Sequence, residues 1–203
     1  MDPHHPDAFL RLQERLFSGV ADVPRHTGWL HGFFELYARY GVVLFGLLLL
    51  AGWWVARGQT DVRLLARALW APVGMMVAIG INQPLGHLVA EPRPYVALHH
   101  VLVLVPRTTD FAFPSDHAVM AGAVAAGALL VDRRLGVVAS VLAVLMAFAR
   151  VYVGAHYPLD VVAGLALGAV VVAVGYAVLR RPLVWLVDRL VDTPLRPLLA
   201  ARG

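Results

Sequence analysis

Three short groups of polar residues carry the side chains that could do chemistry in this sequence. They are Glu91-Pro92-Arg93-Pro94, then Phe113-Pro114-Ser115-Asp116-His117, and then a stretch that holds Arg150, His156 and Asp160. Histidine can act as a nucleophile or a proton donor, and the planar fork of arginine matches the oxygens of a phosphoryl group. These residue types together indicate a site for phosphoryl transfer.

The second group has the pattern of a helix start. Ser115 follows Pro114 as the expected N-cap, and Asp116 falls in the first turn. The free N–H groups at such a helix end form an anion site. His117 is one position further in, so it would lie beside the bound anion, where a proton donor is useful.

The third group has the pattern of a paired histidine and aspartate. Pro158 suits the first turn of a helix, which places Asp160 inside that turn and His156 just before it. An aspartate beside one imidazole nitrogen fixes the tautomer and leaves the other nitrogen free to attack. Arg93 and Arg150 would supply the forks that bind phosphoryl oxygens.

The elements that must position these residues are membrane helices. The chain has 203 residues, a length expected for one domain; 60% of them are hydrophobic and 15% charged, whereas soluble domains have about 45–50% and about 25%. Uncharged windows cover residues 40–56, 68–90, 117–131, 135–149 and 161–179. The two windows of 15 residues must extend into their flanking charges to cross about 30 Å of hydrocarbon. We therefore expect an all-α integral membrane bundle of five transmembrane helices, or six if residues 1–39 add one.

The predicted organisation has three parts. Residues 1–39 form a polar, interfacial N-terminal segment with a short amphipathic helix from Phe9 to Phe17, and they lack the pattern of a cleaved signal peptide. Residues 40–181 form the transmembrane domain that carries the site. Residues 182–203 form an amphipathic tail after Arg180-Arg181-Pro182. Small residues at Gly122, Ala126, Gly164 and Gly168 predict close helix packing.

The arginines predict the orientation. One side of the membrane, formed by the first and third interhelical loops and the C-terminus, carries ten arginines and four acids, and the other carries seven and nine. By the positive-inside rule the arginine-rich side is cytoplasmic. All three polar groups then meet on the outer side of the plasma membrane.

The composition excludes several classes of chemistry. The absence of lysine excludes the P-loop and Schiff-base enzymes, including those that use pyridoxal phosphate. The absence of cysteine excludes disulfides, thiolate zinc sites, iron–sulfur clusters and cysteine phosphatases. The arginines are spread over loops, so we expect no nucleic-acid partner. We also expect no metal and no other cofactor, since no cluster of acids could hold magnesium.

The order R-P, then P-S-x-H, then R-x5-H-x3-D resembles the type 2 phosphatidic acid phosphatase superfamily, and Phe113 to Ala118 is similar to its bacterial undecaprenyl-diphosphatase branch. The resemblance covers roughly residues 82–180 and implies a helical bundle that dephosphorylates lipid phosphates without metal. It implies that His156 is the nucleophile that becomes phosphohistidine, and that His117 protonates the leaving group. Asp160 would orient His156. The phosphoryl oxygens would be bound by Arg93, Arg150 and the amides near Ser115.

The chain departs from the family pattern at three positions. Gly86 stands where the first motif has lysine, and Ala149 stands where the third motif has serine, so each departure removes one phosphate donor. Asp116 replaces a more common glycine and adds a negative charge, which we expect to favour one substrate over others. We hypothesise that His87 partly replaces the missing lysine. Glu91 fits a surface residue or an arginine partner as well as a catalytic role.

The function predicted from these observations is hydrolysis of undecaprenyl diphosphate to the monophosphate, which would supply a carrier for cell-wall peptidoglycan synthesis. One alternative within enzymes is a phosphatase for phosphatidate or phosphatidylglycerophosphate. The other alternative is a lipid-phosphate binding or transport protein without turnover. The sequence leaves the preferred lipid and the oligomeric state open.

Overall fold

The computed structural model describes residues 8–59, 61–191, 193, 194 and 199, and all regular secondary structure in these residues is helical. The helices are α1 (Ala8–Ala21), α2 (Val23–His26), the short 3-10 helix η1 (Gly28–Leu30), α3 (His31–Tyr40), α4 (Val42–Arg57), α5 (Val62–Val89), α6 (Pro94–Ala97), α7 (Asp116–Val131), α8 (Arg133–Tyr152) and α9 (Pro158–Val191). The expected all-α class is confirmed. Residues 1–7 and most of the predicted tail beyond 191 lie outside the described residues.

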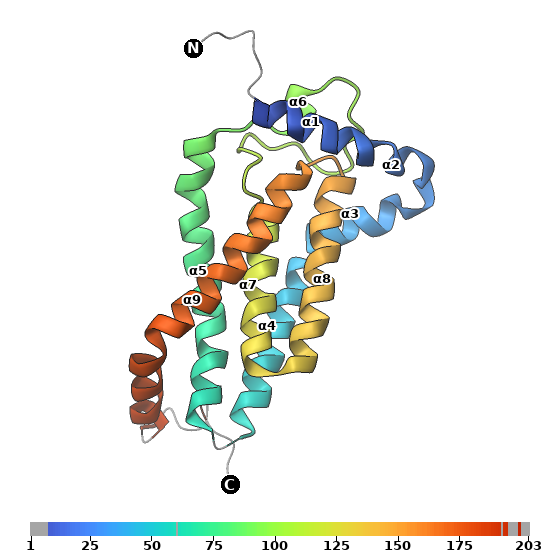
Figure 1. The fold of residues 1–203 in the computed structure, drawn as a ribbon. Coiled ribbons are helices and arrows are strands. Elements are labelled where there is room, and N and C mark those ends of the chain that lie inside the picture. Colours follow the sequence, from blue (N-terminus) through green and yellow to red (C-terminus); the bar gives the residue numbers. More distant parts are fainter. Residues whose placement is uncertain (1–7, 60, 192, 195–198, 200–203) are drawn as a thin grey trace.

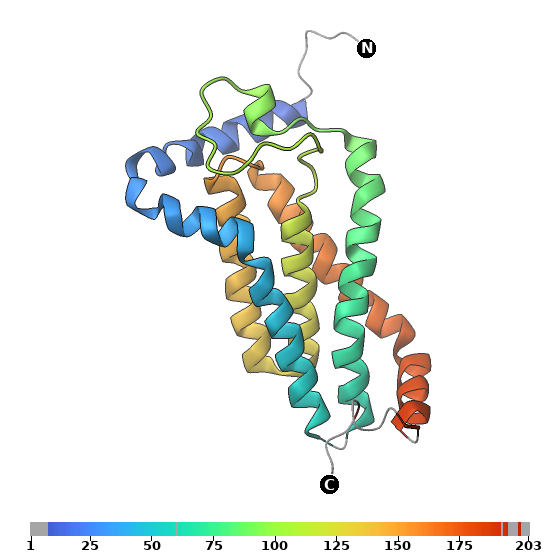
Figure 2. The same cartoon turned by 180° about the vertical axis from the view of Figure 1, so that it is seen from behind.

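The long helices form a bundle with α7 at its centre. α7 packs against α4, α5, α8 and α9, as Figures 1 and 2 show from opposite sides. At one end, α1, α2, α6 and the loop over residues 98–115 lie across the bundle. The opposite end holds the connection between α4 and α5 and the turn between α7 and α8. All three polar groups lie at the first of these ends.

The expected count of five transmembrane helices is not confirmed. Three helical segments are long and apolar enough to cross a membrane: Val62–Ala97, Arg133–Tyr152 and Pro158–Val191. A fourth crossing results if Gly28–Tyr40 and Val42–Arg57, which meet at 54°, are one bent span. The predicted window 135–149 extends into its flanking charges, but 117–131 gains only Asp116, which leaves α7 at 16 residues. A helix of that length covers about 24 Å.

Side chains at the helix ends explain several boundaries. Asp61 Oδ1 accepts a hydrogen bond from the Arg63 amide at 2.8 Å, so α5 begins well before the predicted window at residue 68. Asp132 Oδ1 accepts a hydrogen bond from the Leu135 amide at 2.8 Å, which caps the start of α8 directly after α7 ends. α9 continues through Pro182, so the boundary predicted at residues 181–182 falls inside a helix that bends there (Figure 1).

The N-terminal segment contains the predicted amphipathic helix, which is longer than expected. α1 lies across the site end of the bundle, and its buried face includes Gln13 and Phe17. α3 follows the two short helices α2 and η1, and it joins α4 at Gly41. Within residues 8–40 no separate helix reaches the length of a membrane span, since α1 has 14 residues and α3 has 10.

Glycines bring α7 and α9 into close contact, as their pattern predicted. A Cβ atom on Gly164 would lie 2.8 Å from the Ser115 carbonyl oxygen, and one on Gly168 would collide with the backbone of Val119. The Ser115 amide donates a hydrogen bond to the Asp160 carbonyl at 3.1 Å. This packing fixes the starts of two helices, and both starts carry predicted site residues.

We predict that Gly168→Ala destabilises the bundle. The new methyl group would force α7 and α9 apart, and overpacking of this kind costs about 1–3 kcal/mol. Thermal unfolding in detergent should show a lower melting temperature. Gly46→Ala is the matched control, because no atom lies within 4 Å of the added methyl. Equal melting temperatures for the two variants would contradict the close packing of α7 and α9.

Candidate active site

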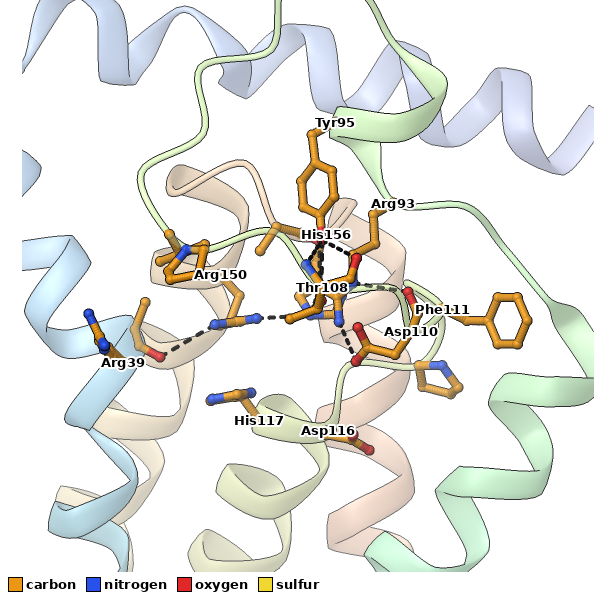
Figure 3. Close-up of a pocket in the computed structure, with 15 residues that line it drawn as sticks. Arg39, Arg93, Tyr95, Thr108, Asp110, Phe111, Asp116, His117, Arg150 and His156 are labelled. Atoms are coloured by element: carbon orange, nitrogen blue, oxygen red, sulfur yellow. Dashed lines mark hydrogen bonds and ion pairs between the residues drawn. The ribbon is translucent and has the colours of Figure 1, made fainter.

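A pocket at the α1 end of the bundle brings together five of the predicted site residues. The cavity has a volume of about 290 Å³, and its lining includes Arg93, Asp116, His117, Arg150 and His156. Figure 3 shows these side chains arriving from the loop before α6, the start of α7, the end of α8 and the loop before α9. Ser115, Asp160 and His87 do not line this cavity.

His156 is buried with a single tautomer favoured by its neighbours. Its Nδ1 lies 2.8 Å from the Ala112 carbonyl oxygen, which can only accept a hydrogen bond. Its Nε2 lies 3.1 Å from Arg93 Nη1 and 3.4 Å from Arg150 Nη2, which can only donate. Nδ1 therefore carries the proton, and the lone pair of Nε2 faces the two guanidinium groups and the pocket.

The surroundings of His156 also favour its neutral form. Burial, followed by the positive charges of Arg150 and Arg93, lowers the pKa of His156 well below its ordinary value of 6.5. A neutral imidazole whose Nε2 is unprotonated is the form that can attack phosphorus.

The two arginines are held at the base of the pocket. Arg93 Nη1 donates to the Ala155 carbonyl at 3.0 Å, and Arg93 Nη2 pairs with Asp110 Oδ2 at 2.8 Å. Arg150 Nη1 donates to the Ala38 carbonyl at 3.4 Å, while its buried Nε has no partner. The two forks thus converge on His156 Nε2 in a pocket that both arginines line.

Asp110 carries a negative charge at the rim of this arrangement. Burial raises the pKa of Asp110, but hydrogen bonds from Thr108 and Arg93 and the charge of Arg93 outweigh it, so the pKa falls below its ordinary value. A phosphoryl group that binds Arg93 must share this guanidinium with the Asp110 carboxylate.

The start of α7 contributes His117 to the pocket wall. Ser115 is the N-cap residue by position, but its side chain makes no capping bond and its buried Oγ has no partner. The Ser115 amide is already bonded to the Asp160 carbonyl, so this amide is not free for phosphate. The Asp116 carboxylate accepts hydrogen bonds from Asn82 and Gln83 at 2.7 and 3.0 Å.

Asp160 lies behind His156. Its Oδ2 is 3.5 Å from His156 Nδ1, farther than the Ala112 carbonyl, and it accepts a hydrogen bond from the Tyr157 amide at 2.8 Å. Asp160 therefore places a carboxylate beside the protonated ring nitrogen, while the Ala112 carbonyl accepts the shorter hydrogen bond.

His87 lies apart from these residues. Its ring packs edge-on against Phe111, with 5.5 Å between the ring centroids, and it lines an adjoining cavity of about 330 Å³ with Asn82 and Gln83. The structure thus separates His87 from the pocket that contains His156.

Comparison with known proteins agrees with this arrangement. The family model of the PAP2 superfamily matches residues 67–182, which is more than half of the chain. The chain belongs to the PAP2 superfamily. Membership, together with helices long enough to cross a membrane, supports a membrane lipid phosphatase as the activity of this site.

Individual PAP2 relatives cover most of the chain. Undecaprenyl-diphosphatase BcrC of Bacillus subtilis is 32% identical over 92% of this chain and 95% of its own length. A PAP2 type phosphatidylglycerolphosphate phosphatase from Bacillus subtilis has a similar fold, with a TM-score of 0.65 and 21% identity over 85% of this chain and 87% of that one. The structure of Aquifex aeolicus LpxE gives a TM-score of 0.55 and 27% identity over 82% of this chain and 95% of its own.

Several residues near the PAP2 site were missed at the sequence level. Arg39 lines the pocket from α3, Asp110 pairs with Arg93, and Gln13 reaches Asp160 from α1. Glu91 is buried and is hydrogen-bonded to Gln13, rather than exposed or paired with an arginine. Arg39, Asp110 and Gln13 belong to no spaced motif; the one signal for Gln13 is a polar residue on the apolar face of an amphipathic helix.

The described residues contain no group of three or more histidine, cysteine or acidic side chains placed to hold a metal ion. The pocket lining contains three arginines and two histidines against two aspartates, a balance of charge that suits an anion.

We predict that His156 stays neutral in the substrate-free protein as the pH falls from about 8 to about 6, because its pKa is lowered below 6.5. The ¹⁵N chemical shifts of its ring should keep the pattern of the Nδ1–H tautomer over this range. The signal is assigned by its loss in His156→Gln. A ring that becomes cationic with a midpoint at or above 6.5 would contradict the described environment.

Proposed function

We propose that this PAP2 protein hydrolyses a polyprenyl diphosphate, undecaprenyl diphosphate, to the monophosphate through a phosphohistidine at His156. The observation that carries the proposal is the position of His156 Nε2, whose lone pair faces two arginines and a pocket that it shares with His117. A phosphoryl group bound by the arginines would meet the nucleophile and the proton donor together.

In the first step, His156 Nε2 attacks the terminal phosphorus. The nitrogen–phosphorus bond forms as the bond from phosphorus to the bridging oxygen breaks. His117, in its protonated form, gives its proton to that oxygen, and the lipid monophosphate leaves. Arg93 and Arg150 stabilise the charge on the phosphoryl oxygens, and the Asp160 carboxylate offsets the positive charge that the His156 ring gains.

In the second step, water attacks the phosphorus of phosphohistidine. His117, now neutral, takes a proton from this water while the nitrogen–phosphorus bond breaks. Inorganic phosphate leaves, and His156 returns to its neutral form with the proton on Nδ1. Both histidines end the cycle in their starting protonation states.

Two observations favour a diphosphate as the substrate. The relative that covers nearly the whole chain is named an undecaprenyl-diphosphatase. In this chain Arg39 adds a third guanidinium to the pocket lining, beside Arg93 and Arg150 (Figure 3). A second phosphate carries further negative charge, which a third arginine would bind.

The arrangement of charge favours an active site on the outer face of the plasma membrane. The arginine pairs Arg133-Arg134 and Arg180-Arg181 lie toward the end of the bundle opposite the pocket. The positive-inside rule places that end in the cytoplasm. Undecaprenyl monophosphate released at the outer face would then be available as a carrier for peptidoglycan synthesis.

The first test of this function is phosphate release from undecaprenyl diphosphate by the purified protein. The wild type should be active in EDTA, and His156→Ala should lose at least about a thousandfold in rate, as expected for removal of a nucleophile. His99→Ala serves as the control, because this exposed histidine lies outside the pocket.

Binding without phosphate release by the wild type would identify a lipid-phosphate binder instead. A strict requirement for added magnesium, or full activity in His156→Ala, would contradict the proposed mechanism. Faster turnover of phosphatidate or phosphatidylglycerophosphate would change the substrate while leaving the chemistry intact.

A second test separates the two residues that could replace the missing lysine. Arg39→Gln should raise KM for undecaprenyl diphosphate about tenfold to a hundredfold, since loss of a charge-assisted contact costs about 1.5–3 kcal/mol. The effect on phosphatidate, which has one phosphate, should be smaller. His87→Ala should leave both substrates unchanged if His87 is outside the site; a larger effect than that of Arg39→Gln would restore His87 as the replacement.

A further inference from the structure

A second group of polar side chains is buried behind His156, and only one of its three members, Asp160, takes part in the steps above. It consists of Gln13, Glu91 and Asp160, which are 0%, 5% and 0% exposed. Gln13 comes from α1, Glu91 from the loop before Arg93, and Asp160 from the first turn of α9. Gln13 Nε2 donates to Asp160 Oδ1 at 2.7 Å and lies 3.2 and 3.3 Å from the two Glu91 oxygens.

The two carboxyl groups of this cluster lie close together. The Gln13 amide nitrogen is 2.7 Å from Asp160 Oδ1 and 3.2 Å from Glu91 Oε1, so one amide group serves both carboxyl groups. Two buried negative charges this close repel each other, which favours a proton on one of the pair. Asp160 accepts the shorter bond from Gln13 and a further bond from the Tyr157 amide at 2.8 Å. These donors favour the negative charge on Asp160 and leave the proton on Glu91.

Glu91 also supports the other group that faces His156 Nδ1. The Glu91 carbonyl accepts a hydrogen bond from the Ala112 amide at 2.9 Å, and the Ala112 carbonyl accepts the bond from His156 Nδ1 at 2.8 Å. The Glu91 backbone therefore supports Ala112, whose carbonyl accepts the hydrogen bond from His156 Nδ1. The Glu91 side chain lies beside the carboxylate of Asp160, the other group near Nδ1. Gln13 completes the set, since its Oε1 accepts from the Leu159 amide at 3.2 Å.

We propose that Glu91, as a neutral carboxylic acid, and Gln13 of α1 are positioning residues that act on His156 through Asp160 and Ala112. This inference rests on the proposed phosphatase function. Gln13 donates a hydrogen bond to Asp160, and the proton on Glu91 would supply a second donor. Together they keep a single negative charge fixed beside the ring that becomes positive when it is phosphorylated. The N-terminal amphipathic helix is thereby part of the catalytic architecture.

Substitutions at Glu91 separate the role of a neutral donor from that of a charge. Glu91→Gln keeps a donor of the same shape, so kcat should stay close to that of the wild type. Glu91→Leu and Gln13→Leu remove the donors, and kcat should fall about tenfold to a hundredfold with KM unchanged, because the nucleophile is misplaced while the arginines still bind the substrate. Glu14→Gln is the matched control, since Glu14 is next to Gln13 and makes the same change of acid to amide outside the cluster.

Infrared spectroscopy gives a readout that does not depend on turnover. The wild type and Glu14→Gln should show the carbonyl stretch of a buried protonated carboxyl group, and Glu91→Gln should lose it. Persistence of that band in Glu91→Gln, or activity in Glu91→Gln as low as in Glu91→Leu, would show that Glu91 is not the neutral donor and would overturn the proposal.

A purely structural role would lower the melting temperature of Glu91→Leu and Gln13→Leu without changing kcat per folded molecule, and this result would also overturn the proposal. An inactive wild type would instead refute the proposed phosphatase function, and the infrared result would still decide the protonation of Glu91.

Discussion

Both ring nitrogens of His156 have fixed partners, and these contacts set the orientation and the charge of the imidazole on which the rest of the site depends. Nδ1 donates to the Ala112 carbonyl, and Nε2 faces the guanidinium groups of Arg93 and Arg150. Two cations beside one ring nitrogen, in a buried place, keep the ring neutral. The same two cations would attract a phosphoryl group to this nitrogen, so in the proposed mechanism substrate binding and activation of the nucleophile depend on one arrangement.

The bundle has to deliver this histidine and His117 to the same pocket from different segments. Close packing at Gly164 and Gly168 brings the starts of α7 and α9 together, and the hydrogen bond from the Ser115 amide to the Asp160 carbonyl joins them directly. Larger side chains at the glycine positions would separate the helix starts. The packing of small residues in the bundle is thus connected to the chemistry at its end.

The sequence predicted the pocket better than it predicted the helices around it. The residues of the three polar groups carry their chemistry in their types and order, and topology alone placed them at one end of the bundle. Five of the predicted site residues line the pocket. The predicted count of five transmembrane helices is not confirmed, and the end of α9 was not predicted correctly, because a proline does not always end a helix: α9 continues through Pro182 to Val191.

The contacts that depend on distant segments were not predictable. Gln13 lies 147 residues from Asp160, and Arg39 reaches the pocket from a helix that was assigned to a polar N-terminal segment. The helix-start pattern at Ser115 predicted a backbone amide free to bind phosphate. In the structure α9 packs so closely that the Asp160 carbonyl accepts a hydrogen bond from this amide. Such pairings arise from the way the helices pack, and no periodicity or spacing in the chain records them.

We propose that His156 becomes covalently phosphorylated in the pocket that it shares with His117. Rapid alkaline quenching during turnover of undecaprenyl diphosphate, followed by peptide mapping by mass spectrometry, tests this claim directly, because phosphohistidine survives in base. We predict a phosphoryl group on His156, at a higher level in His117→Gln when dephosphorylation is slowed. A phosphoryl group on another residue, or turnover with no phosphorylated protein at any time, would contradict the account.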